Sequence, residues 1–435
     1  MARWLYTLGW YCALPLAAVY LAWRAIRQRD YLRHWGERFF GRGPAPAGAP
    51  VIWLHAVSVG ETRAAQPLVE VLAREHPQAH FVLTHMTPTG RAAGESIVRA
   101  LPGRVVQRYL PYDLPSGVRR FLRETRPAVG VLMETELWPN LLHGAQRAGI
   151  SVLLVNARLS EKSAAKAKRY AALIRPAGAH LARVAAQSAG DRDRLARFYD
   201  GPIDVLGNLK FDLAPLPQLV EQGRQARSRW GARPVWLAAS TREGEEALIL
   251  DMFARLRPTT ARLLIVPRHP QRFDEVARLI AERGFVLVRR SSPAWDAPGD
   301  DAVLLGDSMG EMALYYAAAD VALIGGSLLP FGAQNLIESC AVGTPVVLGP
   351  STFNFAQAAA DALAAGAALQ APDANAALAA MDSLTRDADR LQAMRAAALN
   401  FAAAHRGATA RTAAMVGAFL AASPPVRRFS APAAG

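Results

Sequence analysis

The chain has 435 residues, of which 51% are apolar and 20% are charged. This composition is that of a folded globular protein and excludes a disordered one. The length exceeds one ordinary core, so we expect two domains. The formal net charge of +14 favours anionic partners, namely nucleic acid, acidic lipid or phosphorylated substrates. Arginine is spread along the chain and no zinc-finger or RNA-binding signature occurs, so we expect no nucleic-acid partner.

The N-terminal segment from Trp4 to Trp23 (WLYTLGWYCALPLAAVYLAW) contains no charged residue. About 20 apolar residues are enough for a helix to cross a bilayer, and the aromatic residues near its ends are typical of a membrane interface. One arginine, Arg3, precedes this segment, and several follow it: Arg24, Arg27, Arg29, Arg33, Arg38 and Arg42. By the positive-inside rule, we expect a membrane anchor with everything after Trp23 in the cytoplasm.

Two alternatives to a spanning anchor use the same residues. A cleaved signal peptide is disfavoured, because dense arginine directly after the apolar segment impedes export and no clean small-residue cleavage site occurs. A monotopic helix lying in the inner leaflet fits as well as a spanning one. Only two cysteines occur, Cys12 and Cys340, which excludes a disulfide framework and favours a reducing compartment.

Beyond a Pro/Gly/Ala linker at Gly41–Pro50, short apolar runs alternate with helical patterns such as Ala64–Arg74 and Ala164–Ile174. We expect these strands before a break at Pro215–Pro217: Val51–Leu54, Phe81–Thr84, Val105–Leu110, Ala128–Met133, Ser151–Val155 and Ile203–Leu206. A second set follows the break: Pro234–Ala238, Leu263–Val266, Phe285–Val288, Ala302–Leu305, Val321–Ile324 and Pro345–Leu348. Near-continuous apolar strands that alternate with helices predict parallel sheets covered on both faces.

The simplest architecture is therefore α/β, with two doubly wound, Rossmann-like domains whose strand ends face a shared cleft. We expect the anchor and its basic flank at residues 1–40, a first domain at residues 41–213 and a second domain at residues 214–435. The Ala-rich tail, Ala374–Ala422, is expected to be helical and to belong to the second domain.

Acidic motifs follow two predicted strands of the first domain, at the edge where open parallel sheets bind ligands. HAVSVGE begins a helix after the first strand, and METELWPN ends the fourth. Glu61 is either a first-turn acid favoured by the helix dipole or a base for an acceptor hydroxyl, and the dipole would lower its pKa. We expect at most one of Glu134 and Glu136 to point toward a ligand. Lys210, in GNLKFD, is either a solvated linker lysine or a cation aimed at phosphate charge.

The second domain has several loop-to-helix junctions after predicted strands. Arg268, in VPRHP, carries a rigidly placed fork that suits a phosphate or a base carbonyl. Gly306–Glu311 (GDSMGE) and the Gly-rich loop that begins at Gly325 offer backbone amides to a phosphate, and Glu338 in the following helix can accept hydrogen bonds from ribose hydroxyls. Ser240–Glu246 is typical of an N-cap with an acidic first helical turn. Together these junctions predict a sugar-nucleotide transferase.

Ten motifs in the same order extend this prediction: HAVSVGE, THMTPTG (Thr84–Gly90), LPYDLP (Leu110–Pro115), METELWPN, NARLS (Asn156–Ser160), GNLKFD, ASTREGEE, VPRHPQRF, GDSMGE and GPSTFNF. Together they resemble the 3-deoxy-D-manno-octulosonic acid (Kdo) transferase family of Gram-negative bacteria, up to about Phe355. The resemblance implies a GT-B fold, CMP-Kdo as donor and the lipid A precursor as acceptor. It also implies inverting transfer without metal, and we expect no cofactor. From the anchor and the basic charge we expect the enzyme at the cytoplasmic face of the inner membrane, with anionic lipids as further partners.

Residue by residue, the resemblance implies that Glu61 is the proton acceptor and that Glu134 and Lys210 stabilise the transition state. It implies CMP contacts at Pro267, Arg268, Met309, Gly310, Glu311, Asn335, Leu336, Ile337 and Glu338. One stretch departs from the family pattern Gly-Gly-His-Asn-Pro-Leu-Glu: Gln334 stands in place of the histidine and Leu336 in place of the proline. A glutamine can hydrogen-bond but cannot carry the charge of an imidazolium.

Other functions fit parts of the pattern. A transferase for UDP-sugars or a sugar-nucleotide 2-epimerase would share the two α/β domains, although the epimerase would not need the apolar anchor. A membrane-tethered nucleotide-sensing scaffold would bind a nucleotide without consuming a sugar donor. A nucleic-acid binder would show salt-sensitive retention of DNA without sugar transfer.

Overall fold

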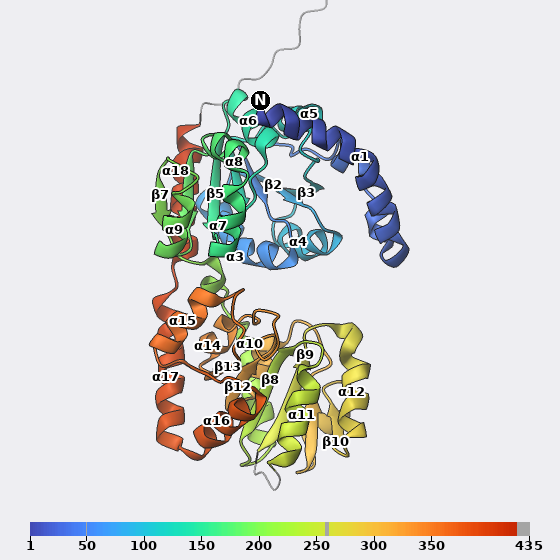
Figure 1. The fold of residues 1–435 in the computed structure, drawn as a ribbon, viewed down its shortest axis with the longest axis vertical. Coiled ribbons are helices and arrows are strands. Elements are labelled where there is room, and N and C mark those ends of the chain that lie inside the picture. The colour runs from blue at the N-terminus through green and yellow to red at the C-terminus, as the bar shows by residue number, and fades with distance from the viewer. Residues whose placement is uncertain (49, 257–260, 424–435) are drawn as a thin grey trace, which may run out of the picture. The chain divides into compact units, whose positions relative to one another are not determined.

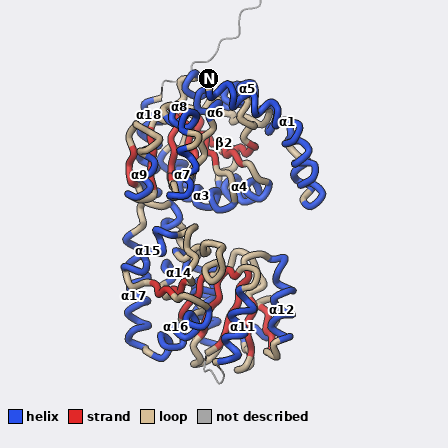
Figure 2. The backbone as a smooth tube through the Cα atoms, viewed as in Figure 1, coloured by secondary structure: helices blue, strands red, loops and turns tan. Residues whose placement is uncertain are grey.

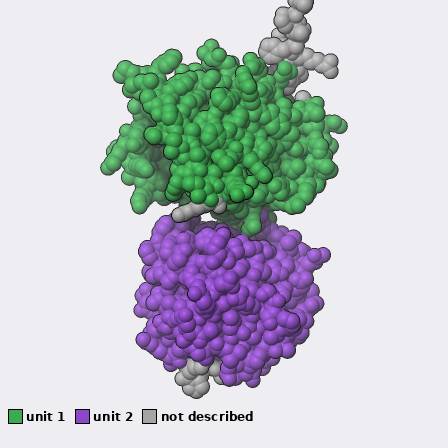
Figure 3. All heavy atoms as spheres, turned by 90° about the vertical axis from the view of Figure 1, so that its right-hand side faces the viewer, with its two compact units in different colours: residues 1–212, 407–435 green, residues 213–406 purple. Residues whose placement is uncertain are grey.

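The computed structural model describes residues 1–48, 50–256 and 261–423, which form two compact units. Unit 1 comprises Met1–Asp212 together with the segment from Gly407 onward, and unit 2 comprises Leu213–Arg406 (Figure 3). Each unit contains one seven-stranded parallel sheet with helices around it (Figures 1 and 2). The predicted α/β class with two doubly wound sheets is therefore confirmed.

The sheet of unit 1 has the order β3-β2-β1-β4-β5-β6-β7. Its strands are β1 (Val51–His55), β2 (His80–His85), β3 (Val105–Tyr109), β4 (Val129–Met133), β5 (Ser151–Ala157), β6 (Arg183–Ala186) and β7 (Ile203–Val205). All but β6 correspond to predicted strands. The run Arg183-Val-Ala-Ala186 has little β-propensity of its own, and it is a strand because it pairs with β5 on one side and β7 on the other.

Both faces of this sheet are buried, as the continuous apolar strands predict. In β1, Ile52 and Leu54 belong to one hydrophobic core and Val51 and Trp53 to another. The helices of unit 1 are α1 (Ala2–Arg27), α2 (Trp35–Phe40), α3 (Val59–Glu75), α4 (Pro88–Ala100), α5 (Pro115–Thr125), α6 (Pro139–Arg147), α7 (Glu161–Lys168), α8 (Ala171–Gly178), α9 (Ala189–Leu195) and α18 (Ala408–Ala422), with short 3₁₀ turns η1 (Arg29–Leu32) and η2 (Leu209–Asp212). The helix predicted at Ala164–Ile174 is divided between α7 and α8.

Unit 2 repeats the design with the order β10-β11-β9-β8-β12-β13-β14. Its strands are β8 (Val235–Thr241), β9 (Arg262–Pro267), β10 (Val286–Arg289), β11 (Ala302–Leu305), β12 (Val321–Ile324), β13 (Val346–Leu348) and β14 (Ala368–Gln370). Its helices are α10 (Pro217–Arg229), α11 (Glu245–Arg255), α12 (Phe273–Glu282), α13 (Met312–Ala317), α14 (Ile337–Val342), α15 (Ala356–Ala364), α16 (Ala374–Arg386) and α17 (Ala388–Ala404), with 3₁₀ turns η3 (Pro270–Arg272) and η4 (Pro293–Asp296). The strand β14 was not predicted, because three residues are too few to show a periodic pattern of apolar residues.

The helical tail is divided between the two units, which corrects the expectation that all of it belongs to the second domain. α16 and α17 belong to unit 2, whereas α18 packs on α3 and β4 of unit 1. Its apolar residues Ala413, Val416 and Leu420 join the core that contains Ile52 and Leu54. A sequence pattern shows that a helix is amphipathic but not which apolar surface it covers.

The strand order of the unit 1 sheet reverses between β1 and β4, and the order of the unit 2 sheet has one of its reversals between β8 and β12. The loops that leave the carboxyl ends of these neighbouring strands run in opposite directions over the sheet. They therefore leave a crevice, where open α/β sheets bind ligands.

We predict that Asp212→Ala lowers the free energy of unfolding of unit 1 by about 1–2 kcal/mol, because its carboxylate caps the N-terminus of α18. Asp212 Oδ1 accepts the Gly407 N–H at 2.6 Å, and Oδ2 accepts the Thr409 N–H at 2.5 Å. Urea unfolding of the full chain measures the effect. The control is Asp193→Ala, which removes an exposed carboxylate paired with its neighbour Arg192. Equal stability of the two variants would contradict the capping role.

Candidate active site

Glu61 lies in the first turn of α3, directly after β1, and its carboxylate is held by the loop that precedes the helix. The Val57 N–H donates to Oε2 at 2.9 Å, and the Ser58 hydroxyl donates to Oε1 at 2.9 Å. Ser58 is also the N-cap, because its Oγ accepts the Glu61 N–H. This reciprocal pair is a variant of the capping box. The loop sequence therefore fixes where the carboxylate sits.

The pKa of Glu61 is raised above its ordinary value, chiefly because burial removes water from the carboxylate. The Val57 N–H, the Ser58 hydroxyl and the Lys210 charge act in the opposite direction, while the nearby Glu134 charge raises the pKa further. The expectation that the helix dipole would give a lowered pKa is therefore wrong. A raised pKa makes Glu61 a stronger base than an exposed glutamate.

Glu134 follows the last residue of β4 and has a left-handed backbone, with φ of 58°. This conformation costs a residue with a Cβ about 1 kcal/mol, and such strain concentrates at functional sites. The Glu134 N–H still donates to Val155 O of β5 at 3.0 Å. Its carboxylate pairs with Lys210, with Nζ 3.1 Å from Oε1 and both side chains largely shielded from solvent.

Glu136 joins the same cluster, which sequence reasoning missed. Burial raises its pKa to about 7, and the negative charges of Glu61 and Glu134 add to this effect. Trp138 Nε1 donates to Glu136 Oε2 at 2.9 Å. The expectation that at most one acid points toward the site rests on strand alternation. That alternation fails because Glu134 leaves the extended conformation.

Lys210 reaches Glu134 because a hydrogen bond holds the backbone of η2 against β5. Asn156, near the end of β5, has φ of 52° and accepts the Leu209 N–H on its side-chain oxygen at 3.0 Å. The Lys210 N–H donates to Asn208 Oδ1, also at 3.0 Å. Asparagine tolerates the left-handed region better than most residues. Its position in NARLS was the signal for this positioning role, although spacing alone does not reveal its partner.

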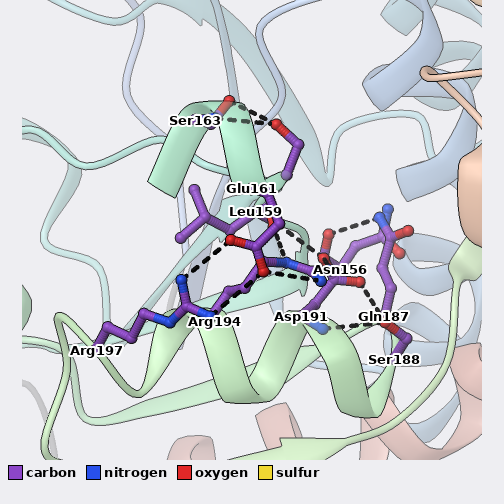
Figure 4. A network of polar contacts seen from close by, with 10 residues as sticks. Asn156, Leu159, Glu161, Ser163, Gln187, Ser188, Asp191, Arg194 and Arg197 are labelled. Atoms are coloured by element: carbon purple, nitrogen blue, oxygen red, sulfur yellow. Dashed lines mark hydrogen bonds and ion pairs between the residues drawn. The ribbon is translucent and has the colours of Figure 1, made fainter. Parts of the chain in front are cut away.

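A polar network behind Asn156 holds the loop after β5 (Figure 4). Gln187 Nε2 donates to the Asn156 carbonyl at 2.9 Å, and the buried Asp191 accepts the Leu159 N–H at 2.9 Å. Arg194 pairs with Asp191 at 2.9 Å and also donates to the Leu159 carbonyl. The side chains that hold this loop come mainly from α9 and its N-cap. The NARLS motif therefore supports the site without belonging to it.

His55, the first residue of HAVSVGE, is fully buried and has a structural role. Its Nδ1 lies 2.9 Å from Thr84 Oγ1 of β2. Burial, together with the nearby His85, lowers the pKa of His55 to about 3, so the ring is neutral at physiological pH.

In unit 2, Arg268 follows β9 and contacts Gln334, the residue that departs from the family pattern. Arg268 Nε donates to Gln334 Oε1 at 3.1 Å. A neutral glutamine can accept this bond, whereas an imidazolium would repel the guanidinium. The substitution is therefore compatible with the position of Arg268. Pro267, which ends β9, is buried.

The Gly-rich loop after β12 packs closely against β8 and is hydrogen-bonded to Glu245. Buried Glu245 accepts the Gly326 N–H at 2.6 Å and the Leu328 N–H at 3.0 Å. A Cβ on Gly325 would lie 2.4 Å from the Ser240 carbonyl oxygen, so glycine is required there for close approach to β8. The expectation that these amides bind phosphate is wrong for Gly326 and Leu328, because a carboxylate already takes them.

The segment Asn335–Glu338 presents backbone and polar groups rather than apolar side chains. Leu336 and Ile337 are buried, and the Ile337 N–H donates to Asn335 Oδ1 at 3.0 Å. Asn335 Nδ2 donates to Glu338 Oε1 at 3.0 Å, in the first turn of α14. The side chains of Asn335 and Glu338 therefore form an oriented amide–carboxylate pair.

The loop after β11 ends at Glu311, the N-cap of α13. Its carboxylate pairs with Arg290 at 3.2 Å and accepts a hydrogen bond from the Ser308 hydroxyl. Met309 is exposed, and Gly310 has φ of 84°, which suits glycine. Among the residues that the structure describes, no group of three or more His, Cys, Asp or Glu side chains could hold a metal ion.

The fold is similar to that of a solved glycosyltransferase and of a solved UDP-GlcNAc 2-epimerase. A glycosyltransferase structure from Rickettsia africae aligns with a TM-score of 0.59 over 85% of this chain and 98% of that one, at 13% identity. The UDP-GlcNAc 2-epimerase of Neisseria meningitidis, bound to UDP-GlcNAc, aligns with a TM-score of 0.56 over 86% of this chain and all of that one, also at 13% identity. These likenesses define the GT-B class of fold, which both activities share.

Sequence relatives decide between those activities. The family model described as 3-deoxy-D-manno-octulosonic-acid transferase matches residues 33–213. The 3-deoxy-D-manno-octulosonic acid transferase of Bordetella pertussis is 47% identical over 95% of this chain and 98% of its own length. That of Haemophilus influenzae is 36% identical over 82% of this chain and 84% of its own length. The chain belongs to the Kdo transferase family and is a glycosyltransferase.

We predict that Glu136→Gln stabilises the protein at high pH but not at low pH. The pKa of this carboxyl is about 7 in the folded protein against an ordinary 4.5, so the folded state disfavours its charge. Stability is full below pH 4.5 and is lost as the pH rises toward 7, by about 3 kcal/mol in total. The amide removes this loss. Unfolding midpoints at pH 4 and pH 8 test it, with exposed Glu70→Gln as the control, and a pH-independent difference would contradict the assignment.

Proposed function

We propose that this transferase moves Kdo from CMP-Kdo to the lipid A precursor, lipid IVA, in lipopolysaccharide core biosynthesis. The observation that carries the proposal is the partly buried Glu61 carboxylate beside the Glu134–Lys210 pair, at the switch point of the unit 1 sheet. Ligands bind at such switch points, and a carboxylate with a raised pKa suits proton abstraction from a hydroxyl.

In the proposed step, Glu61 accepts the proton of a primary hydroxyl on a glucosamine of the acceptor. The hydroxyl oxygen attacks the anomeric carbon of Kdo, the bond from that carbon to the phosphate oxygen breaks, and its electron pair leaves with CMP. Because attack and departure take place on opposite faces, the configuration inverts. Lys210, oriented by Glu134, stabilises the charge that develops, and the step assigns no role to a metal.

The proposed donor site lies on unit 2, at the carboxyl ends of β9, β11 and β12. The exposed Arg268 fork would bind the CMP phosphate, while Asn335 and Glu338 would take the ribose hydroxyls. Pro267, Leu336 and Ile337 would contact CMP through their backbones. Met309, Gly310 and Glu311, in the loop after β11, would lie beside its base. The Arg268–Gln334 bond supports this assignment, because it joins two of the three loops.

We further propose a location at the cytoplasmic face of the inner membrane. Within the part of the chain that the structure describes, one helix, Ala2–Ile26, is long and apolar enough to cross a bilayer, and only 11% of its most apolar stretch is buried. A net charge of +14 would attract anionic lipids and the acceptor phosphates. Attachment to the membrane would place the enzyme beside its proposed lipid acceptor.

Glu61→Gln is expected to lower the transfer rate by about 10²–10⁴-fold, because the amide cannot take the hydroxyl proton. CMP binding should stay unchanged, since the residue belongs to the other unit. Mass spectrometry of product from lipid A precursor and CMP-Kdo measures transfer, and it also identifies donor, acceptor and the number of sugars.

The matched control is Glu70→Gln, an exposed glutamate on the same helix, which should retain the parent rate. Near-normal turnover by Glu61→Gln would end the base assignment. In the parent enzyme, activity should fall at low pH with a midpoint above the ordinary pKa of glutamate, because burial raises the pKa of Glu61.

The donor assignment predicts that CMP binds at least about tenfold more tightly than UMP, a difference of roughly 1.4 kcal/mol. Calorimetric titration of the full chain measures both. Arg268→Ala should weaken CMP binding by about tenfold, because it removes a phosphate fork. Arg278→Ala changes an exposed arginine on α12 and serves as the control. Tighter binding of UMP would favour a UDP-sugar enzyme instead.

A further inference from the structure

Helix α1 is fastened to unit 1 near its N-terminal end. Thr7 is buried, and its hydroxyl lies 3.1 Å from Asn140 Oδ1 at the start of α6. Asn140 is held in turn by Asp113, which accepts its backbone N–H at 2.9 Å. The ring of Trp10 packs 5.4 Å from that of Tyr112. The first turns of α1 therefore contact the folded unit through a buried polar network.

The C-terminal end of the same helix is fastened as well. Leu21 and Ala25 are buried in a small core with Tyr31, and Tyr112 packs against this core. Tyr112 thus serves the contacts at both ends. From Thr7 to Leu21 the helix is roughly 20 Å long, at 1.5 Å per residue. Figure 1 shows α1 running along the outside of unit 1, beginning beside α6 and α8.

The opposite face of α1 is apolar and exposed. Its large side chains are 50–80% exposed, and they recur with helical spacing: Trp4, Leu5, Leu8, Tyr11, Leu16, Val19, Tyr20, Trp23 and Ile26. Soluble monomeric proteins rarely expose a continuous apolar surface of this kind. The helix thus has one face against protein and one apolar face that is largely exposed.

We propose that α1 is a monotopic helix that lies in the plane of the cytoplasmic leaflet, with its exposed face among the lipid acyl chains and unit 1 on the cytoplasmic side. This inference deepens the membrane location proposed above and rests on it. A spanning helix is surrounded by lipid over about 20 residues. Such a helix could not keep Thr7 on Asn140 and also keep Leu21 in the core against which Tyr112 packs, because both contacts belong to one folded unit.

The occupant of the exposed face is an anionic lipid surface, which the charge of this segment favours. Residues 1–42 contain seven arginines and only two acids, Asp30 and Glu37. An amphipathic helix with flanking basic residues and interfacial tryptophans binds in the plane of anionic membranes. In-plane binding also leaves Arg3 on the cytoplasmic side, whereas spanning would carry it across.

The position of the N-terminus tests the topology. Ala2→Cys is introduced together with Cys12→Ser, and the remaining Cys340 is buried. Spheroplasts are treated with a membrane-impermeant maleimide, and Leu399→Cys in the same background is the cytoplasmic control. We expect both sites to react only after the membrane is broken. Labelling of position 2 in intact spheroplasts would overturn the in-plane helix in favour of a spanning one.

Depth in the bilayer gives an independent measurement on purified full-length protein in phosphatidylglycerol–phosphatidylcholine vesicles. A fluorophore is attached to native Cys12, or to single cysteines that replace Leu5, Leu16 or Trp23, and is quenched with lipids brominated at different depths. An in-plane helix places all four labels at one shallow depth. A graded profile, deepest near the middle of the helix, would contradict the proposal.

Charge on the exposed face should weaken membrane binding without stopping the chemistry. Leu8→Glu and Leu16→Glu are each expected to lower vesicle partitioning by about tenfold or more while transfer to detergent-dispersed acceptor persists. The control is Leu399→Glu, at an exposed leucine of unit 2. If the parent protein does not bind vesicles, both the in-plane helix and the proposed membrane location are overturned. If it instead forms concentration-dependent dimers, the exposed face of α1 is assigned to a second copy of the chain. Transfer in detergent would keep the enzymatic proposal standing in either case.

Discussion

The parallel pairing of strands is the constraint on which the rest of this structure depends. Parallel strands send all their carboxyl ends to one edge of a sheet, and the reversal of strand order between β1 and β4 leaves a crevice at that edge. Glu61 leaves the sheet after one of these strands and Glu134 after the other. Two residues more than seventy positions apart thereby interact electrostatically in unit 1.

The chemistry at this edge follows from the cost of burying like charges. Three carboxylates and one lysine share the site. Burial, with a smaller contribution from the neighbouring negative charges, raises the pKa values of Glu61 and Glu136, while Glu134 is paired with Lys210. The surrounding motifs limit that cost by orienting donors. Ser58 and Val57 hold Glu61, and Asn156 holds the turn that carries Lys210. Several residues of these motifs therefore serve to position the charged side chains.

Unit 2 shows the same division between packing and binding. Its glycines, with Glu245, bring the loop after β12 against β8, so the most glycine-rich stretch is mainly structural. In the proposed donor site, Arg268, Asn335 and Glu338 supply the polar groups. The glutamine at position 334 is accommodated because it accepts a hydrogen bond from the guanidinium that a charged histidine would repel.

The sequence by itself determined the α/β class and most of the strands, because apolar periodicity and motif spacing are local properties. It did not reveal β6, the placement of α18 or the role of Glu136. Each of these depends on a neighbour distant in the chain or, for Glu136, on one residue leaving the extended conformation. The first helix shows the same limit. Its composition determined that it is apolar, but only tertiary contacts at both of its ends decided that it lies along unit 1, since burial and hydrogen bonding to α6 and Tyr112 are not written in the helix itself.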